Sequence, residues 1–205
     1  MAFDGLVAKS VCNELKCLIG GKITKIFEPN KNEIILGIYS NSLNYALNIS
    51  IDSSLYRLNL TTHTKPNPQN VLGFCMVLRK HLTNGIIQNI YMNGFERVIF
   101  IDILVKNELN DLVKKTLVIE LMGKHSNVIL LNNLIVIDSL RHLNKFDNST
   151  RDIFPGSKYQ FITSNKYDFS KSFDDFFRNI LDYSLSPFSL STVISKIYNG
   201  FGKNN

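Results

Sequence analysis

Short apolar runs separated by tight polar breaks constrain the fold of this 205-residue chain most strongly. In the first half the breaks are Pro29–Asn32, Ser40–Ser42 and Asp52–Ser54. Connections this short join antiparallel neighbours, because parallel strands need a long crossover. The predicted strands are Lys22–Glu28, Glu33–Tyr39, Tyr45–Ile51, Leu55–Leu60, Ile86–Met92, Arg97–Val105, Lys115–Met122, Asn127–Leu131 and Leu134–Leu140. Asn132-Asn133 fits a two-residue hairpin turn between the last two.

Two segments with apolar residues at helical spacing accompany the strands. Asp4–Ile19 is predicted as an amphipathic helix that stops at Gly20-Gly21. A second helix, about Pro68–Leu82, follows the proline-containing loop Thr61–Asn70. The order is helix, strands, helix, strands, without βαβ alternation. We therefore expect an α+β fold, an antiparallel β-sandwich or flattened barrel with helices at its edges.

The C-terminal part is predicted to be helical, unlike the strand-rich part before it. Phe173–Leu181 and Ser189–Tyr198 are predicted as short helices on either side of Leu185-Ser186-Pro187, a helix–turn–helix-like arrangement. Two short helices build little core by themselves. We therefore divide the chain into a main domain, residues 1–170, and the start of a second domain, residues 171–205.

Composition narrows the class of partner and the compartment. The net charge of +6 and the pI of about 9.2 favour anionic partners, nucleic acid first, although a merely basic surface gives the same numbers. No apolar run approaches the ~20 residues of a membrane-spanning helix, and the first residues lack the pattern of a secretion signal. Three cysteines, an odd and sparse set, suggest reduced thiols. We expect a cytoplasmic protein without membrane insertion.

No catalytic set stands out in the sequence. The four histidines are scattered, and neither HExxH nor GxSxG occurs. Ser126 next to His125 is not a dyad, because adjacent strand residues point to opposite faces. We therefore expect no catalytic residues, no metal and no cofactor, and classify the chain as a non-enzyme.

Three places carry donors suited to a nucleic acid. The turn Gly123–Asn127 holds Lys124 and His125, more donor chemistry than a hairpin needs. Glu96-Arg97 follows turn residues, and is either an exposed ion pair or a guanidinium held ready for a phosphate or base. Basic clusters at Arg79-Lys80 and around Arg141 are either solvated element ends or contacts to an RNA backbone.

Taken together, several ordered motifs resemble the N-terminal domain of the NFACT family, which includes the bacterial RqcH proteins and proteins called fibronectin-binding protein A. The tail resembles the start of that family's helix-hairpin-helix domain. The matching motifs are Phe3-Asp4-Gly5, Phe74–Leu82, Phe95-Glu96-Arg97, Glu120–Leu130, Ile137–His142 and Phe154–Tyr159. The resemblance implies a fold similar to the N-terminal domain of MutM/Fpg DNA glycosylases. Their proline–glutamate start is replaced here by Met1-Ala2-Phe3-Asp4, so glycosylase chemistry is not expected.

The resemblance also implies a role and a site. Members of the family act in ribosome-associated quality control, on large ribosomal subunits obstructed by peptidyl-tRNA. They recruit tRNA, mainly alanyl-tRNA in bacteria, for mRNA-independent C-terminal tailing, and this domain grips the anticodon arm. The family's Asp-Arg pair falls on Glu96-Arg97, with glutamate in place of aspartate. Glu120, Lys124 and His125 complete the expected tRNA site, and the turn at 123–127 is expected close to Arg97.

Two other functions stay open on the sequence. The family's older name implies a fibronectin-binding surface adhesin, exported without a signal peptide. The glycosylase-like fold alone implies DNA binding or repair, an argument by analogy.

Overall fold

The fold is seen in a computed structural model that describes residues 3–63, 65–66, 68, 71–144, 151–163, 165–168, 178 and 189–201. Nine strands form one antiparallel sheet in the order β4-β3-β2-β1-β5-β6-β7-β8-β9. The strands are β1 (Lys22–Asn30), β2 (Glu33–Ser40), β3 (Leu43–Ser50), β4 (Arg57–Thr61), β5 (Ile86–Met92), β6 (Val98–Lys106), β7 (Leu112–Glu120), β8 (Asn127–Asn132) and β9 (Ile135–Ser139). The helices are α1 (Gly5–Glu14), α2 (Gly73–Leu82) and α4 (Leu190–Ile197), with 3₁₀ turns η1 (Leu15–Leu18) and η2 (Gly123–His125).

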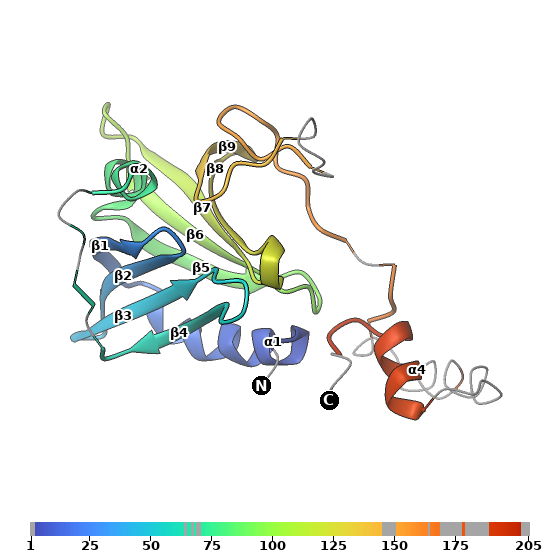
Figure 1. The fold of residues 1–205 in the computed structure, drawn as a ribbon. Coiled ribbons are helices and arrows are strands. Elements are labelled where there is room, and N and C mark those ends of the chain that lie inside the picture. Colours follow the sequence, from blue (N-terminus) through green and yellow to red (C-terminus); the bar gives the residue numbers. More distant parts are fainter. Residues whose placement is uncertain are drawn as a thin grey trace.

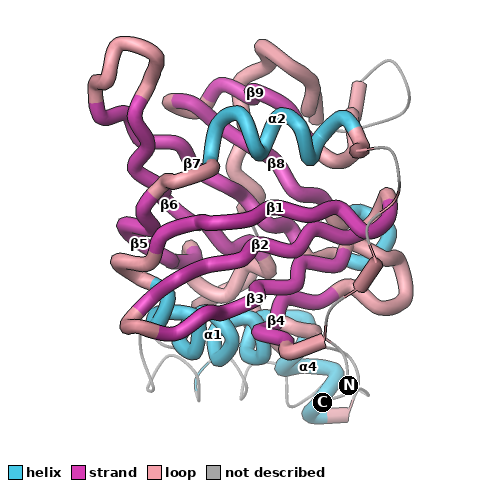
Figure 2. Tube along the Cα trace, turned by 90° about the vertical axis from the view of Figure 1, so that its left-hand side faces the viewer, coloured by secondary structure: helices cyan, strands magenta, loops and turns pink. Residues whose placement is uncertain are grey.

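The sheet is divided at the junction of β1 and β5. These strands share one residue pair, Lys22 with Ile86, whereas every other neighbouring pair forms a longer ladder. Apolar side chains from β1–β4 and from β5–β8 pack in one core, closed at opposite edges by α1 and α2 (Figures 1 and 2). The α+β antiparallel prediction is confirmed, and the two predicted layers are halves of one open sheet bent over itself.

The first helix forms as predicted but changes character at its end. The Asp4 side chain caps α1 by accepting from the backbone N–H of Val7 at 2.9 Å. Ala8 and Cys12 face the core, and the last turn tightens into η1. Gly20, at φ +82°, then turns the chain into β1.

The second helix starts later than predicted, at Gly73 and not near Pro68. Its N-cap residue, Leu72, offers no side-chain acceptor. The cap comes instead from β1, where the Glu28 carboxylate accepts from the backbone N–H of Cys75 at 2.8 Å. A cap supplied from 47 residues away has no local sequence signature.

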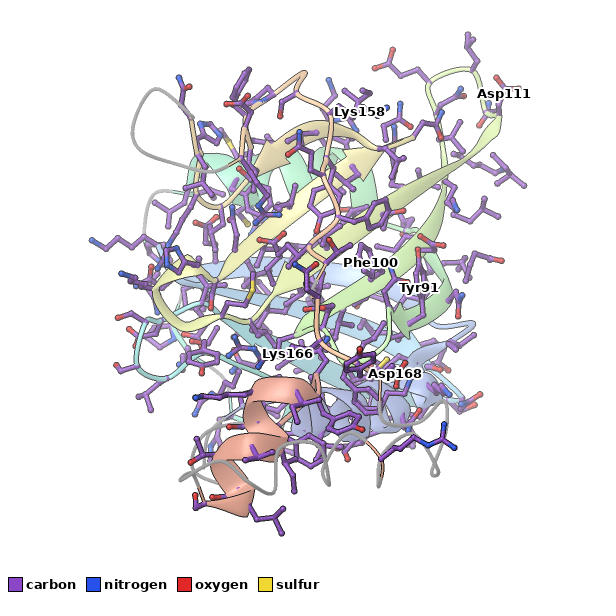
Figure 3. All side chains as sticks on the ribbon, turned by 90° about the vertical axis from the view of Figure 1, so that its right-hand side faces the viewer. Tyr91, Phe100, Asp111, Lys158, Lys166 and Asp168 are labelled. Atoms are coloured by element: carbon purple, nitrogen blue, oxygen red, sulfur yellow. The ribbon has the colours of Figure 1, made fainter. Side chains whose placement is uncertain are left out.

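The outer face of the second half-sheet carries a smaller core. Val98, Phe100, Val118 and Ile129 are covered there by the segment 151–163, through Ile153 and Tyr159. Tyr91 stacks on Phe100 with ring centroids 5.2 Å apart (Figure 3). An irregular segment thus completes the layer structure.

The β8–β9 turn and the C-terminal helices differ in how far the structure tests their predictions. The hairpin between β8 and β9 turns at Asn133-Leu134, both at positive φ, and not at Asn132-Asn133, because Asn132 still pairs with Ile135. The predicted helix Phe173–Leu181, apart from residue 178, and the Leu185–Pro187 turn lie outside the described residues. The following helix is present as α4, capped by Ser189.

Candidate nucleic-acid interface

The residues predicted to bind tRNA, from Glu96-Arg97 to His125, meet where β6 begins and β7 ends. Val98 pairs with Glu120 across the ladder, and the backbone N–H of Leu121 donates to the Arg97 carbonyl at 2.9 Å. η2 follows directly, so Lys124 and His125 lie at the same end of the sheet as Arg97. The expectation that this turn is close to Arg97 is confirmed.

A cavity of about 270 Å³ opens beside Arg97. Its walls come from five separate places in the chain: the start of α1, the β5–β6 connection, Met122, Lys166 and residues 199–201. Phe95 is held between two glycines: a Cβ on Gly5 would lie 2.2 Å from its carbonyl oxygen, and one on Gly200 3.0 Å from its Cβ. The close approach explains the glycine of the opening Phe3-Asp4-Gly5 motif.

Glu96 and Arg97 do not pair with each other. The Glu96 carboxylate accepts from the side-chain amide of Asn199 at 2.7 Å. The Arg97 guanidinium is half-buried and makes no hydrogen bond or ion pair within the described part of the chain. The idea of a guanidinium held by its neighbouring carboxylate is therefore wrong, and Arg97 keeps its donors available at the cavity wall.

Glu120 is placed in the interior, which corrects the expectation that it faces the nucleic acid. Its carboxylate is fully buried and accepts two hydrogen bonds from Arg151, at 2.9 and 2.8 Å, and one from the Tyr159 hydroxyl at 2.9 Å. Burial, and then the adjacent carboxylate, raise the pKa of Tyr159. Both oxygens have partners inside the protein, so Glu120 presents no acceptor to a base.

Lys124 and His125 remain accessible on η2. Both side chains are exposed, while Gly123 adopts φ +61° at the start of the turn. The Ser126 hydroxyl oxygen accepts from the backbone N–H of Met122 at 2.8 Å. Asn127 also bonds to neighbouring backbone, as expected of turn-shaping residues.

Arg141 holds the protein together and is not free for a phosphate. Its guanidinium donates to the carbonyls of Lys124 and Ser126, at 3.2 and 3.4 Å, in one half of the fold. In the other half it donates to Asn32 Oδ1 and to the Ile51 carbonyl, both at 3.0 Å. Arg141 was predicted to contact an RNA backbone, but its hydrogen bonds instead link the two halves of the sheet.

The Arg79-Lys80 cluster lies away from Arg97. The Arg79 Nε donates to the Ile26 carbonyl at 2.9 Å, a bond within the fold. Exposed Lys80 lies beside Lys106, at the far end of β6, and eight strand steps of ~3.3 Å place that end about 26 Å from Val98. The basic clusters therefore do not converge on one surface.

The sequence reasoning missed Arg151, Tyr159 and Asn199 as partners of the predicted site residues. Tyr159 ends the Phe154–Tyr159 motif and Arg151 lies three residues before it, so this arginine was a usable signal. Asn199 carries no such signal. In the described ranges no group of three metal-binding side chains exists, and no helix there is long and apolar enough to cross a membrane.

The fold and this site define a β-rich domain of the NFACT type. A model of the NFACT N-terminal and middle domains matches residues 4–205. The chain therefore belongs to the NFACT family.

Two relatives of the chain carry the name RqcH. It is 37% identical over 163 residues to "Rqc2 homolog RqcH" of Bacillus subtilis, covering 78% of this chain and 29% of that protein. Against the protein of the same name from Streptococcus suis it is 34% identical, covering 99% of this chain and 37% of the relative. The chain thus spans about a third of these relatives' length.

Solved structures agree with the fold. The N-terminal domain of fibronectin-binding protein PavA from Streptococcus pneumoniae superposes with a TM-score of 0.90 at 32% identity, over 99% of this chain and 76% of that one. The fibrinogen-binding protein of Staphylococcus aureus gives 0.85 at 31% identity, over 100% of this chain and 73% of that one.

Proposed function

We propose that this chain is the tRNA-binding part of a ribosome-associated quality control factor. In this proposal Arg97, Lys124 and His125 contact the anticodon arm of a tRNA, alanyl-tRNA in particular, on an obstructed large subunit. The whole protein then supports mRNA-independent alanine tailing without being an enzyme itself. The names of the RqcH relatives and the basic charge of the chain support this role.

The observation that carries the proposal is the state of Arg97. Its guanidinium has no partner among the described residues, although it lines a cavity next to exposed Lys124 and His125. A planar guanidinium offers five donors to phosphate oxygens or base edges and stacks on a base. Glu96 is held by Asn199 and orders the peptide that carries Arg97.

The binding test compares Arg97→Ala with Lys25→Ala, a lysine exposed on β1. Loss of a charge-assisted contact is worth about 1.5–3 kcal/mol, so we expect alanyl-tRNA affinity to fall at least about tenfold in Arg97→Ala. Lys25→Ala should change it little. Equal affinity for both variants, with unchanged folding, would remove Arg97 from the site.

A fibronectin-binding adhesin is the second candidate, favoured by the name of the PavA structure. Surface proteolysis of intact cells, with a cytosolic control protein, distinguishes the two locations. Cleavage of this protein in intact cells would favour the adhesin, whereas protection would leave the cytoplasmic role.

A further inference from the structure

A second concave surface lies at the other end of the sheet. It is a groove of about 360 Å³ between the end of α2 and the open end of the β6–β7 hairpin. Figures 2 and 3 show this hairpin projecting beyond the rest of the sheet, with Asp111 in its loop. Three lysines from three elements line it, Lys80 of α2, Lys106 of β6 and Lys115 of β7. None belongs to the surface around Arg97.

The groove carries a net positive charge, because Glu108 is the one acidic side chain that faces the three lysines among the described residues of its lining. Within the described ranges none of the three lysines has an ion pair or hydrogen bond, whereas neighbouring Lys114 pairs with Asp102 at 3.4 Å. Burial lowers the pKa of Lys115. Burial, and then the charges of Lys115 and Lys80, lower the pKa of His81. An anionic ligand would relieve this repulsion.

The rest of the lining is mixed, with the apolar side chains of Val105, Leu109 and Val113 beside the polar ones of His81, Asn107 and Glu108. Val105 and Val113 face each other across the β6–β7 ladder, and Leu109 stands at the hairpin tip with 81% of its surface exposed. Of the described residues that line the groove, none is Phe, Tyr, Trp or Arg, and the half-buried His81 carries the one ring on which a base could stack. A phosphodiester backbone has no apolar group to place against the valines and the leucine. A peptide with both acidic and apolar side chains does.

The hairpin end is held by its own hydrogen bonds. The Asn107 side-chain oxygen accepts from the backbone N–H groups of Leu109 and Asp111, at 2.9 and 2.8 Å. The backbone N–H of Asn107 also donates to the Asp111 carbonyl at 2.9 Å. A preformed loop costs little ordering entropy on binding.

We propose that this groove docks an acidic segment of a partner protein. Its carboxylates meet Lys80, Lys106 and Lys115, and one large apolar side chain lies against Val105 and Val113. The docking uses no residue of the proposed tRNA surface, so it stands or falls independently of tRNA binding.

The test uses a labelled peptide, two copies of Asp-Glu-Phe-Glu-Asp-Leu, and fluorescence anisotropy with the whole protein. Two comparison peptides carry Ser in place of Phe and Leu, or Asn and Gln in place of the acids. We expect both to bind at least about tenfold more weakly. The triple variant Lys80→Gln, Lys106→Gln, Lys115→Gln should weaken binding of the first peptide by about tenfold, since three ion pairs at the protein surface are lost.

The matched control is Lys22→Gln, Lys25→Gln, Lys31→Gln, which removes the same charge from exposed lysines of β1 and its turn. This control variant should bind the peptide with unchanged affinity. In the parent protein, hydrogen exchange should show protection of residues 105–115 when the peptide is added. Equal effects of the two triple variants, or equal binding of the Ser peptide, would overturn the proposal. Binding of oligouridine RNA, lost in the groove variant, without peptide binding would make the groove a nucleic-acid surface and overturn it too.

Discussion

The guanidinium of Arg151 donates two hydrogen bonds to the carboxylate of Glu120, at 2.9 and 2.8 Å. Glu120 is fully buried and its neighbour Leu121 bonds to Arg97, so this pair fixes the strand end beside the proposed tRNA surface. Its energetic value depends on both partners being present, because an unpaired buried carboxylate is costly.

We expect Arg151→Met to destabilise the protein by about 3 kcal/mol, because it leaves Glu120 buried without its counter-charge. Tyr159→Phe removes one donor and should cost about 1 kcal/mol. Urea unfolding measures both. Arg97→Met is the matched control, expected within about 0.5 kcal/mol of the parent, since Arg97 has no partner in the described residues. Equal stability of the two arginine variants would contradict the assignment.

The second prediction concerns the glycine that opens α1. A Cβ on Gly5 would lie 2.2 Å from the Phe95 carbonyl oxygen and 2.6 Å from Gly200 Cα, so Gly5→Ala forces these backbones apart. We expect a loss of about 1–3 kcal/mol in unfolding free energy. Gly73→Ala, at the same position of α2 and with no atom within 4 Å of the new Cβ, should be neutral or stabilising. Thermal unfolding of the two variants measures this difference. Similar losses of stability in both variants would refute the steric argument.

The stability of the protein should depend on pH through the carboxyl group of Glu28. Burial raises the pKa of Glu28 above 4.5, outweighing the bond from the Cys75 N–H, and Asp138 adds repulsion. The folded state therefore holds this proton to higher pH than the unfolded state. The contribution of Glu28 to stability is full below pH 4.5 and is lost as pH rises through the folded pKa.

Glu28→Gln keeps an acceptor for Cys75 and cannot titrate. We expect the variant to gain stability relative to the parent as pH rises from 4.5 toward neutral, in chemical unfolding at a series of pH values. A constant difference across that range would show that Glu28 does not titrate differently in the two states.

The fourth prediction concerns the β8–β9 turn. Leu134 adopts φ +67°, a left-handed conformation that is strained for a side chain with a Cβ. Leu134→Gly should raise the free energy of unfolding by about 1 kcal/mol, since a turn of this type favours Gly there. Leu134→Ala keeps the Cβ and should bring no gain. A gain as large in the alanine variant would point to the exposed leucine side chain and not to the backbone.

Most of the fold could be predicted because its information is local. The breaks at Pro29–Asn32 and Ser40–Ser42 mark the turns between strands that pair in the structure, and Asp4 signals the start of α1. The start of α2 could not be predicted, because its cap is a glutamate on another strand. The bend at Lys22–Ile86 likewise depends on packing between distant elements.

The site was less accessible to sequence reasoning. Proximity of the turn at 123–127 to Arg97 followed from the motifs, but the orientation of each side chain did not. Glu120 and Arg141 carry the same chemistry as nucleic-acid contacts, and only their partners across the fold, Arg151 and Asn32, reveal their structural roles. Whether Arg97, Lys124 and His125 contact tRNA stays a prediction.

The close packing of Gly5 and Gly200 around Phe95 matters for the design of truncated forms of this protein. The backbone N–H of Leu6 donates to the Gly200 carbonyl at 3.3 Å, so residues almost two hundred positions apart close over the peptide that carries Arg97. A fragment cut before Asn199 would keep the whole sheet, yet lose one wall of the cavity and the partner of Glu96. Such a fragment could pass every test of folding and still report falsely weak binding.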